Sequence, residues 1–222
     1  MANDAAPVRG VVFDLDGTLV DSAGDLRDAA NLLLAELGKK PIDLETTIGF
    51  IGRGVPTLVR RVLGHREVAV EGAELEARTA RFLAHYEPRV TASTRPYPGV
   101  VAMLEDLQAR GIGLALCTNK IESATRSICD VLGLTRFFPV IVGGDTLPQR
   151  KPDPAPLLLA IRKLGLEPEE VLYVGDSETD YATARGAQVR FAYFEGGYQR
   201  AAIDDFRPDF RLAATADVKG LI

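Results

Sequence analysis

The stretch Val11-Val12-Phe13-Asp14-Leu15-Asp16-Gly17-Thr18-Leu19-Val20-Asp21 carries most of the information about how this chain folds. Its apolar start predicts a buried strand, which ends abruptly at two carboxylates, Asp14 and Asp16. Because alternate residues of an extended segment share a face, both carboxylates can point toward one centre. Gly17 allows a tight turn directly after them. Two like charges this close raise each other's pKa unless a cation or a shared proton offsets them. The stretch therefore predicts a strand that delivers two acids to a pocket.

The composition is that of an ordinary soluble globular protein, with 46% hydrophobic and 26% charged residues among 222. This length fits one large domain, or a medium domain with a small one. A net charge of -5 with no basic stripe argues against nucleic acid or an anionic membrane as the main partner. No run approaches the ~20 apolar residues that span a bilayer, and we expect no secretory signal. With only Cys117 and Cys129, we expect no disulfide framework and a cytoplasmic location.

Short apolar runs recur along the chain and are continuous rather than alternating, which is typical of strands covered on both faces of a parallel sheet. The runs are Val11–Phe13, Ile112–Cys117, Val140–Val142, Val171–Val174 and Val189–Phe194. Helical patterns lie between them, for example over residues 100–107 and Ala155–Leu164. For the second of these we expect Asp153 as N-cap, Pro154 as first helical residue and Gly165 as terminator. The alternation predicts an α/β fold with a Rossmann-like parallel sheet.

The segment 22–94 does not show this alternation of strands and helices. It contains no convincing strand, and helical patterns cover residues 26–37, 55–64 and 73–86. We therefore expect an all-helical cap domain over 22–94, inserted into an α/β core made of residues 1–21 and 95–222. The tail from Pro208 to Ile222 is expected to add a short strand and a helix.

Polar side chains follow four of the expected strands, at the sheet edge where ligands bind in open parallel sheets. They are Asp14 and Asp16, then Thr118 and Asn119, then Lys151, then Asp176 and Asp180. Acids, a hydroxyl and one ammonium suit phosphoryl transfer. A dianionic phosphate ester needs cations to approach such acids, and Mg²⁺ prefers oxygen ligands. Zinc is disfavoured because His65 and His85 both fall in the insertion.

With these four groups of residues in this order, the sequence resembles the haloacid dehalogenase-like hydrolases, in particular the phosphatase branch with a helical cap inserted after the first motif. The resemblance covers nearly the whole chain. It implies that Asp14 is a nucleophile that forms an aspartyl-phosphate. Asp16 would protonate the leaving alkoxide and then activate water. Thr118 and the backbone N–H of Asn119 would hold phosphoryl oxygens, and Lys151 would neutralise charge.

The same resemblance implies a Mg²⁺ site made of Asp14, Asp176 and the main-chain carbonyl of Asp16, with Asp180 supporting it. The expected protein is a Mg²⁺-dependent phosphomonoester hydrolase that acts on a small phosphorylated metabolite, as a monomer or homodimer.

Two longer stretches are similar to the phosphoglycolate phosphatase subgroup. One runs from Gly143 to Leu157 around Lys151, and the other is the glycine-flanked cap stretch Ile48–Pro56. Such a loop can offer N–H groups and the Arg53 guanidinium to a carboxylate. We expect Arg53 or its neighbours to contact the glycolate carboxylate of 2-phosphoglycolate. The alternative is that Arg53 is a surface residue of a mobile loop.

Other functions of the same superfamily stay open at this point. Asp16 argues against a dehalogenase, because displaced halide needs no proton, and a phosphonate-cleaving enzyme would need a cap lysine. A phosphatase of another small phosphometabolite or a phosphosugar mutase fits the core motifs equally well. A protein that only binds a phosphorylated ligand fits less well, because pure binding does not require an acid at Asp16.

Overall fold

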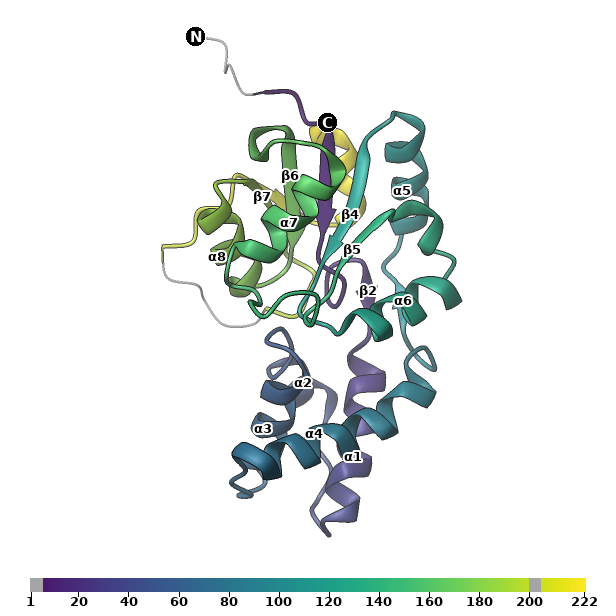
Figure 1. Cartoon of the computed structure of the whole chain (residues 1–222). Helices are drawn as coiled ribbons and strands as arrows, with labels where there is room; N and C mark the ends of the chain where they lie inside the picture. Colours follow the sequence, from purple (N-terminus) through teal and green to yellow (C-terminus); the bar gives the residue numbers. More distant parts are fainter. Residues whose placement is uncertain (1–5, 200–204) are drawn as a thin grey trace.

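The computed structural model describes residues 6–199 and 205–222, and its centre is a six-stranded parallel sheet (Figure 1). The strand order is β5-β4-β1-β6-β7-β8. The strands are β1 (Gly10–Phe13), β4 (Gly113–Cys117), β5 (Val140–Val142), β6 (Val171–Gly175), β7 (Arg190–Phe194) and β8 (Phe210–Leu212). Every neighbouring pair in this sheet is parallel. The α/β fold expected from the sequence is confirmed, and β8 comes from the tail.

Helices cover both faces of the sheet, and alternate strand residues enter two apolar clusters. Val12 belongs to the cluster that includes residues of α7 (Ala155–Leu164) and α8 (Glu178–Ala187). Val11 and Phe13 belong to the cluster on the other face, together with α5 (Val100–Ala109) and α6 (Glu122–Val131). Burial on both faces explains why the strand sequences are continuous apolar runs rather than alternating ones.

The start of α7 differs slightly from expectation. The helix begins at Ala155, and Pro154 rather than Asp153 occupies the N-cap position. The Asp153 carboxylate still accepts a hydrogen bond from the N–H of Ala155, at 2.8 Å. The end is as expected, because Gly165 adopts the left-handed conformation that glycine tolerates best.

The segment 22–94 folds into helices that lie together below the carboxyl edge of the sheet in Figure 1. They are α1 (Ala23–Glu36), α2 (Leu44–Ile48), α3 (Val55–His65) and α4 (Gly72–Tyr86), and no strand occurs in these residues, all of which are described. The short helix α2 was not expected from the sequence. It begins where the Asp43 side chain accepts a hydrogen bond from the N–H of Thr46.

A two-stranded antiparallel ribbon marks the place where the chain leaves the sheet region and returns. It pairs β2 (Val20–Asp21) with β3 (Arg95–Pro96), and no sequence pattern predicts it because each strand has only two residues. The apolar cluster of the α5 face continues into α1, α3 and α4. The division into a core and a cap domain therefore stays a prediction, for which the ribbon supplies a natural boundary.

Asp25 ties the start of α1 to the returning chain. Its carboxylate is 1% exposed and accepts hydrogen bonds from the N–H and hydroxyl groups of both Ser93 and Thr94, at 2.6–2.9 Å. Burial by itself raises the pKa of Asp25, but the four hydrogen bonds outweigh it and lower the pKa below the ordinary value. Asp25 thus joins the two chain segments that enter and leave the helical insertion.

Across residues 6–199 and 205–222, no helix combines the length and apolarity that a transmembrane segment requires.

Candidate active site

The carboxyl ends of β1, β4, β5 and β6 bring the predicted polar residues together. Beyond the strand end, the N–H of Asp14 donates to the carbonyl of Val174 at 2.9 Å. In the same way, the N–H of Thr118 donates to the carbonyl of Val142 at 3.0 Å. These bonds extend the ladder past the last strand residues, so the two side chains sit on rigid backbone.

Lys151 lies at the centre of this edge and is almost completely buried, with 1% of its side chain exposed. Its ammonium is 3.1 Å from Asp14 Oδ1 and 2.6 Å from Asp180 Oδ1, and it donates to the Tyr173 hydroxyl at 2.9 Å. Burial would lower the pKa of Lys151, but Asp14 and Asp180 outweigh burial and raise the pKa above the ordinary value. Lys151 is therefore a permanent positive charge beside Asp14.

Three carboxylates form a buried cluster: Asp14, Asp176 and Asp180 each offer an oxygen, and these oxygens lie within 4.8 Å of one another. Burial raises the pKa of Asp14 to about 6 even though Lys151 counteracts it. Burial, together with Asp180 and Asp14, also raises the pKa of Asp176. Three ionised carboxylates and one ammonium leave two negative charges, which a divalent, oxygen-seeking cation would neutralise. The donor set therefore fits Mg²⁺.

The expected metal ligands differ in the hydrogen-bond partners that hold their side chains. Asp176 is held by the Thr18 hydroxyl at 3.1 Å and by the N–H of Tyr198 at 2.6 Å. Asp180 joins the cluster, but its two oxygens already accept hydrogen bonds from Lys151, Tyr173 and Ser177, which fits the supporting position expected for it. Asp16, in contrast, is not part of this cluster and its side chain pairs with Lys120, so only its main-chain carbonyl stays a predicted ligand.

Gly17 allows Asp176 to lie against the turn that follows the first strand. Its φ of +84° is in the left-handed region, and a Cβ at this position would come within 2.4 Å of Asp176 Oδ2. Any side chain here would therefore displace a candidate metal ligand.

Asp16 has two partners that sequence reasoning missed. Its carboxylate pairs with the Lys120 ammonium at 3.0 and 2.8 Å and accepts a hydrogen bond from the Ser22 hydroxyl at 2.5 Å. The Lys120 ammonium also lies 4.9 Å from the centre of the Tyr86 ring of α4. Burial would lower the pKa of Lys120, but Asp16 and Tyr86 raise it. The only available signal was the position of Lys120 directly after Thr118-Asn119, because single lysines are usually surface residues.

Thr118 and Asn119 occupy the edge as expected, but the Asn119 side chain has a further use. Its amide donates to the carbonyl of Lys151 and to the carbonyl of Gly52, both at 3.0 Å. Asn119 thus links the Lys151 loop to the loop between α2 and α3. Gly144 packs so closely that a Cβ there would meet the Asn119 carbonyl at 2.3 Å.

Arg53 lies in the loop that precedes α3, with 51% of its side chain exposed. Its guanidinium pairs with Glu178 of α8 at 2.5 Å, which joins the helical insertion to the sheet region. Nearby, Arg61 donates to the carbonyl of Phe50 at 3.2 Å. Both arginines line a hollow of about 300 Å³ that also reaches Asp176. The structure shows no contact that tests the predicted carboxylate role of Arg53.

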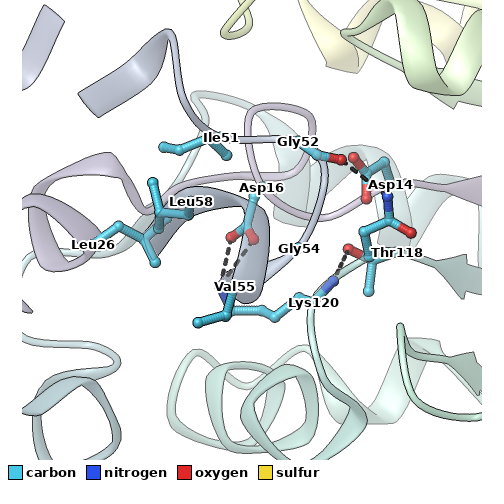
Figure 2. A pocket seen from close by; sticks show the side chains of 11 residues that line it. Asp14, Asp16, Leu26, Ile51, Gly52, Gly54, Val55, Leu58, Thr118 and Lys120 are labelled. Carbon is cyan, nitrogen blue, oxygen red and sulfur yellow. Dashed lines mark hydrogen bonds and ion pairs between the residues drawn. The ribbon is translucent and has the colours of Figure 1, made fainter. Parts of the chain in front are cut away.

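A second, smaller hollow also borders Asp14 and Asp16 (Figure 2). Its volume is about 40 Å³. Thr118, Asn119 and Lys120 form its polar wall. The facing wall is apolar and comes from the insertion: Leu26, Ile51, Val55 and Leu58. The hollow is therefore shaped for a small group with a charged end.

Comparison with known proteins agrees with this geometry. A family model described as haloacid dehalogenase-like hydrolase matches residues 11–194, and the chain belongs to this family. A phosphoglycolate phosphatase of Cereibacter sphaeroides is 52% identical over 196 residues, which is 88% of this chain and 89% of that protein. One of Rhodospirillum rubrum is 45% identical over 212 residues, covering 89% of this chain and 88% of the relative.

A solved structure described as a predicted phosphoglycolate phosphatase from Haemophilus somnus superposes with a TM-score of 0.90. It is 30% identical in sequence, and the match covers 96% of this chain and 97% of that one. The expected superfamily and its hydrolase chemistry are thus confirmed for this chain.

Proposed function

We propose that the protein is a Mg²⁺-dependent phosphomonoester hydrolase whose substrate is 2-phosphoglycolate. The observation that carries this proposal is the position of Lys151 between Asp14 and Asp180, at the same sheet edge as Thr118 and Asp176. The names of relatives that are 45–52% identical support the choice of substrate.

The residues divide the reaction into two displacements. In the first, an Asp14 oxygen attacks phosphorus, the phosphorus–oxygen ester bond breaks, and Asp16 donates its proton to the departing alkoxide. In the second, Asp16 takes a proton from a water molecule, whose oxygen attacks the aspartyl-phosphate and restores the Asp14 carboxylate. Thr118 and the N–H of Asn119 hold phosphoryl oxygens, and Lys151 offsets their charge throughout.

Asp14, Asp176 and the main-chain carbonyl of Asp16 would hold the Mg²⁺, with Asp180 behind them. When bound, the ion offsets the negative charge that builds up on the transferring phosphoryl group. Thr18 and the N–H of Tyr198 orient the Asp176 carboxylate for this purpose.

The size of the smaller hollow favours a small leaving group. One water needs roughly 10–15 Å³ by this kind of measure. A hollow of about 40 Å³ therefore holds only a few heavy atoms. Glycolate has five, one of which is the bridging oxygen at phosphorus. A sugar ring needs more room, which the larger hollow near Arg53 offers.

The cellular location and the oligomeric state of the protein are also part of the proposal. We infer that the protein acts in the cytoplasm, as a monomer or homodimer, on a small phosphorylated metabolite. Cys117 and Cys129 are both free and buried, which is consistent with a reducing compartment.

The test is phosphate release from a panel of 2-phosphoglycolate, glucose 1-phosphate, pyrophosphate and nucleoside monophosphates, with and without Mg²⁺. We expect the highest kcat/KM with 2-phosphoglycolate, and EDTA should abolish turnover. Preference for glucose 1-phosphate, or interconversion of phosphosugars, would contradict the proposed substrate. Absence of turnover on the whole panel would favour a binding protein.

A further inference from the structure

Lys120 is a buried cation at the active site that the two displacements described above do not use. Only 3% of its side chain is exposed, yet it lines the small hollow together with Asp14 and Thr118. Figure 2 shows its ammonium directed at the Asp16 carboxylate. A buried charge costs free energy unless it is paired, so the position of Lys120 calls for an anionic partner at every stage of the reaction.

In the structure that partner is Asp16, which the reaction needs elsewhere. Both Asp16 oxygens accept from Lys120, and Oδ1 also accepts from Ser22. To protonate a leaving oxygen, the Asp16 carboxyl must direct one of these atoms at the substrate. The arrangement seen here is therefore a resting one, in which Lys120 and Ser22 hold Asp16.

The surroundings of Lys120 suit an exchange of partners. The wall formed by Leu26, Ile51, Val55 and Leu58 is apolar, so none of these side chains competes with a ligand for the ammonium. The Tyr86 ring lies 4.9 Å from the ammonium and stabilises a cation there. The Tyr86 hydroxyl is also buried, and Lys120 is the charged group that lies next to it.

We propose that Lys120 recognises the substrate carboxylate and, by accepting it in place of Asp16, frees Asp16 to act on the leaving oxygen. This inference rests on the proposed function, because it assigns the carboxylate of 2-phosphoglycolate to a residue. A substrate with a carboxylate two bonds from the bridging oxygen completes the exchange, and a neutral phosphomonoester leaves Asp16 paired with Lys120. Specificity then acts through catalysis as well as through binding.

Arg53 was the residue expected to bind this carboxylate, and its setting is less suitable. Its side chain is half exposed and already paired with Glu178, at the mouth of the larger hollow. A buried ammonium discriminates more strongly between a charged and a neutral ligand than an exposed guanidinium does, because solvent screens it less.

The experiment compares kcat/KM for 2-phosphoglycolate and for 2-hydroxyethyl phosphate, which replaces the carboxylate by a neutral CH₂OH group. The variants are Lys120→Met and Lys120→Arg, with Arg53→Met as matched control. For Lys120→Met we expect a loss of roughly 100-fold or more on 2-phosphoglycolate and a much smaller loss on the neutral ester. Lys120→Arg should keep part of the preference, and Arg53→Met should keep it nearly whole.

Equal losses on both substrates with Lys120→Met would show that Lys120 only positions Asp16, and would overturn the inference. A preference lost with Arg53→Met and kept with Lys120→Met would overturn it in favour of the cap loop. Failure of the proposed function is distinguishable, because the wild-type enzyme would then show no preference for 2-phosphoglycolate.

A binding measurement keeps the inference testable if Lys120→Met does not fold. In a background of Asp14→Asn, which prevents turnover, adding Asp16→Asn removes the competitor for Lys120. Calorimetry with Mg²⁺ should then show roughly tenfold tighter binding of 2-phosphoglycolate and a smaller change for 2-hydroxyethyl phosphate. Unchanged or weaker binding of 2-phosphoglycolate would overturn the exchange.

Discussion

The carboxyl edge of the sheet and the loop around Arg53 both present charged side chains to the active site, but they hold them differently. At the sheet edge, Lys151 has 1% of its side chain exposed and contacts two carboxylates. In the loop, the Arg53 side chain is 51% exposed and forms an ion pair with Glu178. Charges at the sheet edge are fixed before a substrate arrives, whereas the loop is held by exposed contacts that exchange easily. We infer that the edge performs the chemistry and that the loop around Arg53 contributes little to it.

The largest expected effect separates the two regions most clearly. Asp14→Asn removes the nucleophile while keeping its shape, and we expect kcat to fall by at least about 10⁴-fold. The measurement is phosphate release at saturating Mg²⁺, with the melting temperature as a check on folding. Activity above a few per cent of wild type would mean that another group attacks phosphorus.

Lys151→Met should have the next largest effect, a loss of roughly 10³-fold in kcat, because it removes the charge that faces the transferring group. Lys163→Met, at the exposed end of α7, is the matched control and should leave kcat unchanged. Similar losses from the two lysines would contradict a special electrostatic role for the buried one.

Asp25→Asn tests how the insertion is tied to the sheet. We expect a loss of about 2 kcal/mol in the free energy of unfolding at pH 7, because hydrogen bonds to a charged group are removed. The folded-state pKa of Asp25 lies below its unfolded value of about 4. Its stabilisation is therefore present above that pH and is lost as the pH falls through the folded-state pKa.

Urea unfolding of wild type and Asp25→Asn at pH 7, 5 and 3.5 measures this dependence. The difference in the free energy of unfolding between the two proteins should be constant from pH 7 to 5 and should become smaller toward pH 3.5. A difference in the free energy of unfolding that grows in acid would contradict the lowered pKa of this carboxyl.

The smallest expected effect belongs to the loop. Arg53→Ala removes an exposed ion pair, so kcat/KM for 2-phosphoglycolate should fall by less than about fivefold. Glu178→Gln removes the other partner and should behave alike. A large loss confined to 2-phosphoglycolate would restore Arg53 as the carboxylate ligand expected from the sequence.

The sequence predicted the sheet edge well because its information is local. Asp14, Thr118 and Asp176 each follow directly after an apolar strand, and Lys151 lies in the loop after β5; parallel strands bring their carboxyl ends to one edge. The expected parallel sheet was therefore enough to predict that these residues lie together, without knowledge of any side-chain contact.

The missed features depend on contacts between distant segments. Lys120 is recognisable as an active-site residue only once it is seen buried against Asp16, 104 positions away. Asp25 gains its role from Ser93 and Thr94, and β2 and β3 are too short to leave a periodic pattern. The partner of Arg53 likewise lies 125 positions along the chain. No spacing rule encodes such pairs, so the substrate-facing part of the site was the least predictable.

The most direct test of the central claim is to mix the enzyme with Mg²⁺ and 2-phosphoglycolate and to quench the reaction with acid within one turnover. The peptide that contains Asp14 is then analysed by mass spectrometry. The wild-type enzyme is the sample, because Asp16→Asn would slow the formation of the phosphorylated enzyme as well as its hydrolysis. We expect one phosphoryl group on Asp14, absent when Mg²⁺ is removed. Turnover with no phosphoryl group on that peptide, or with the group on another side chain, would contradict the account.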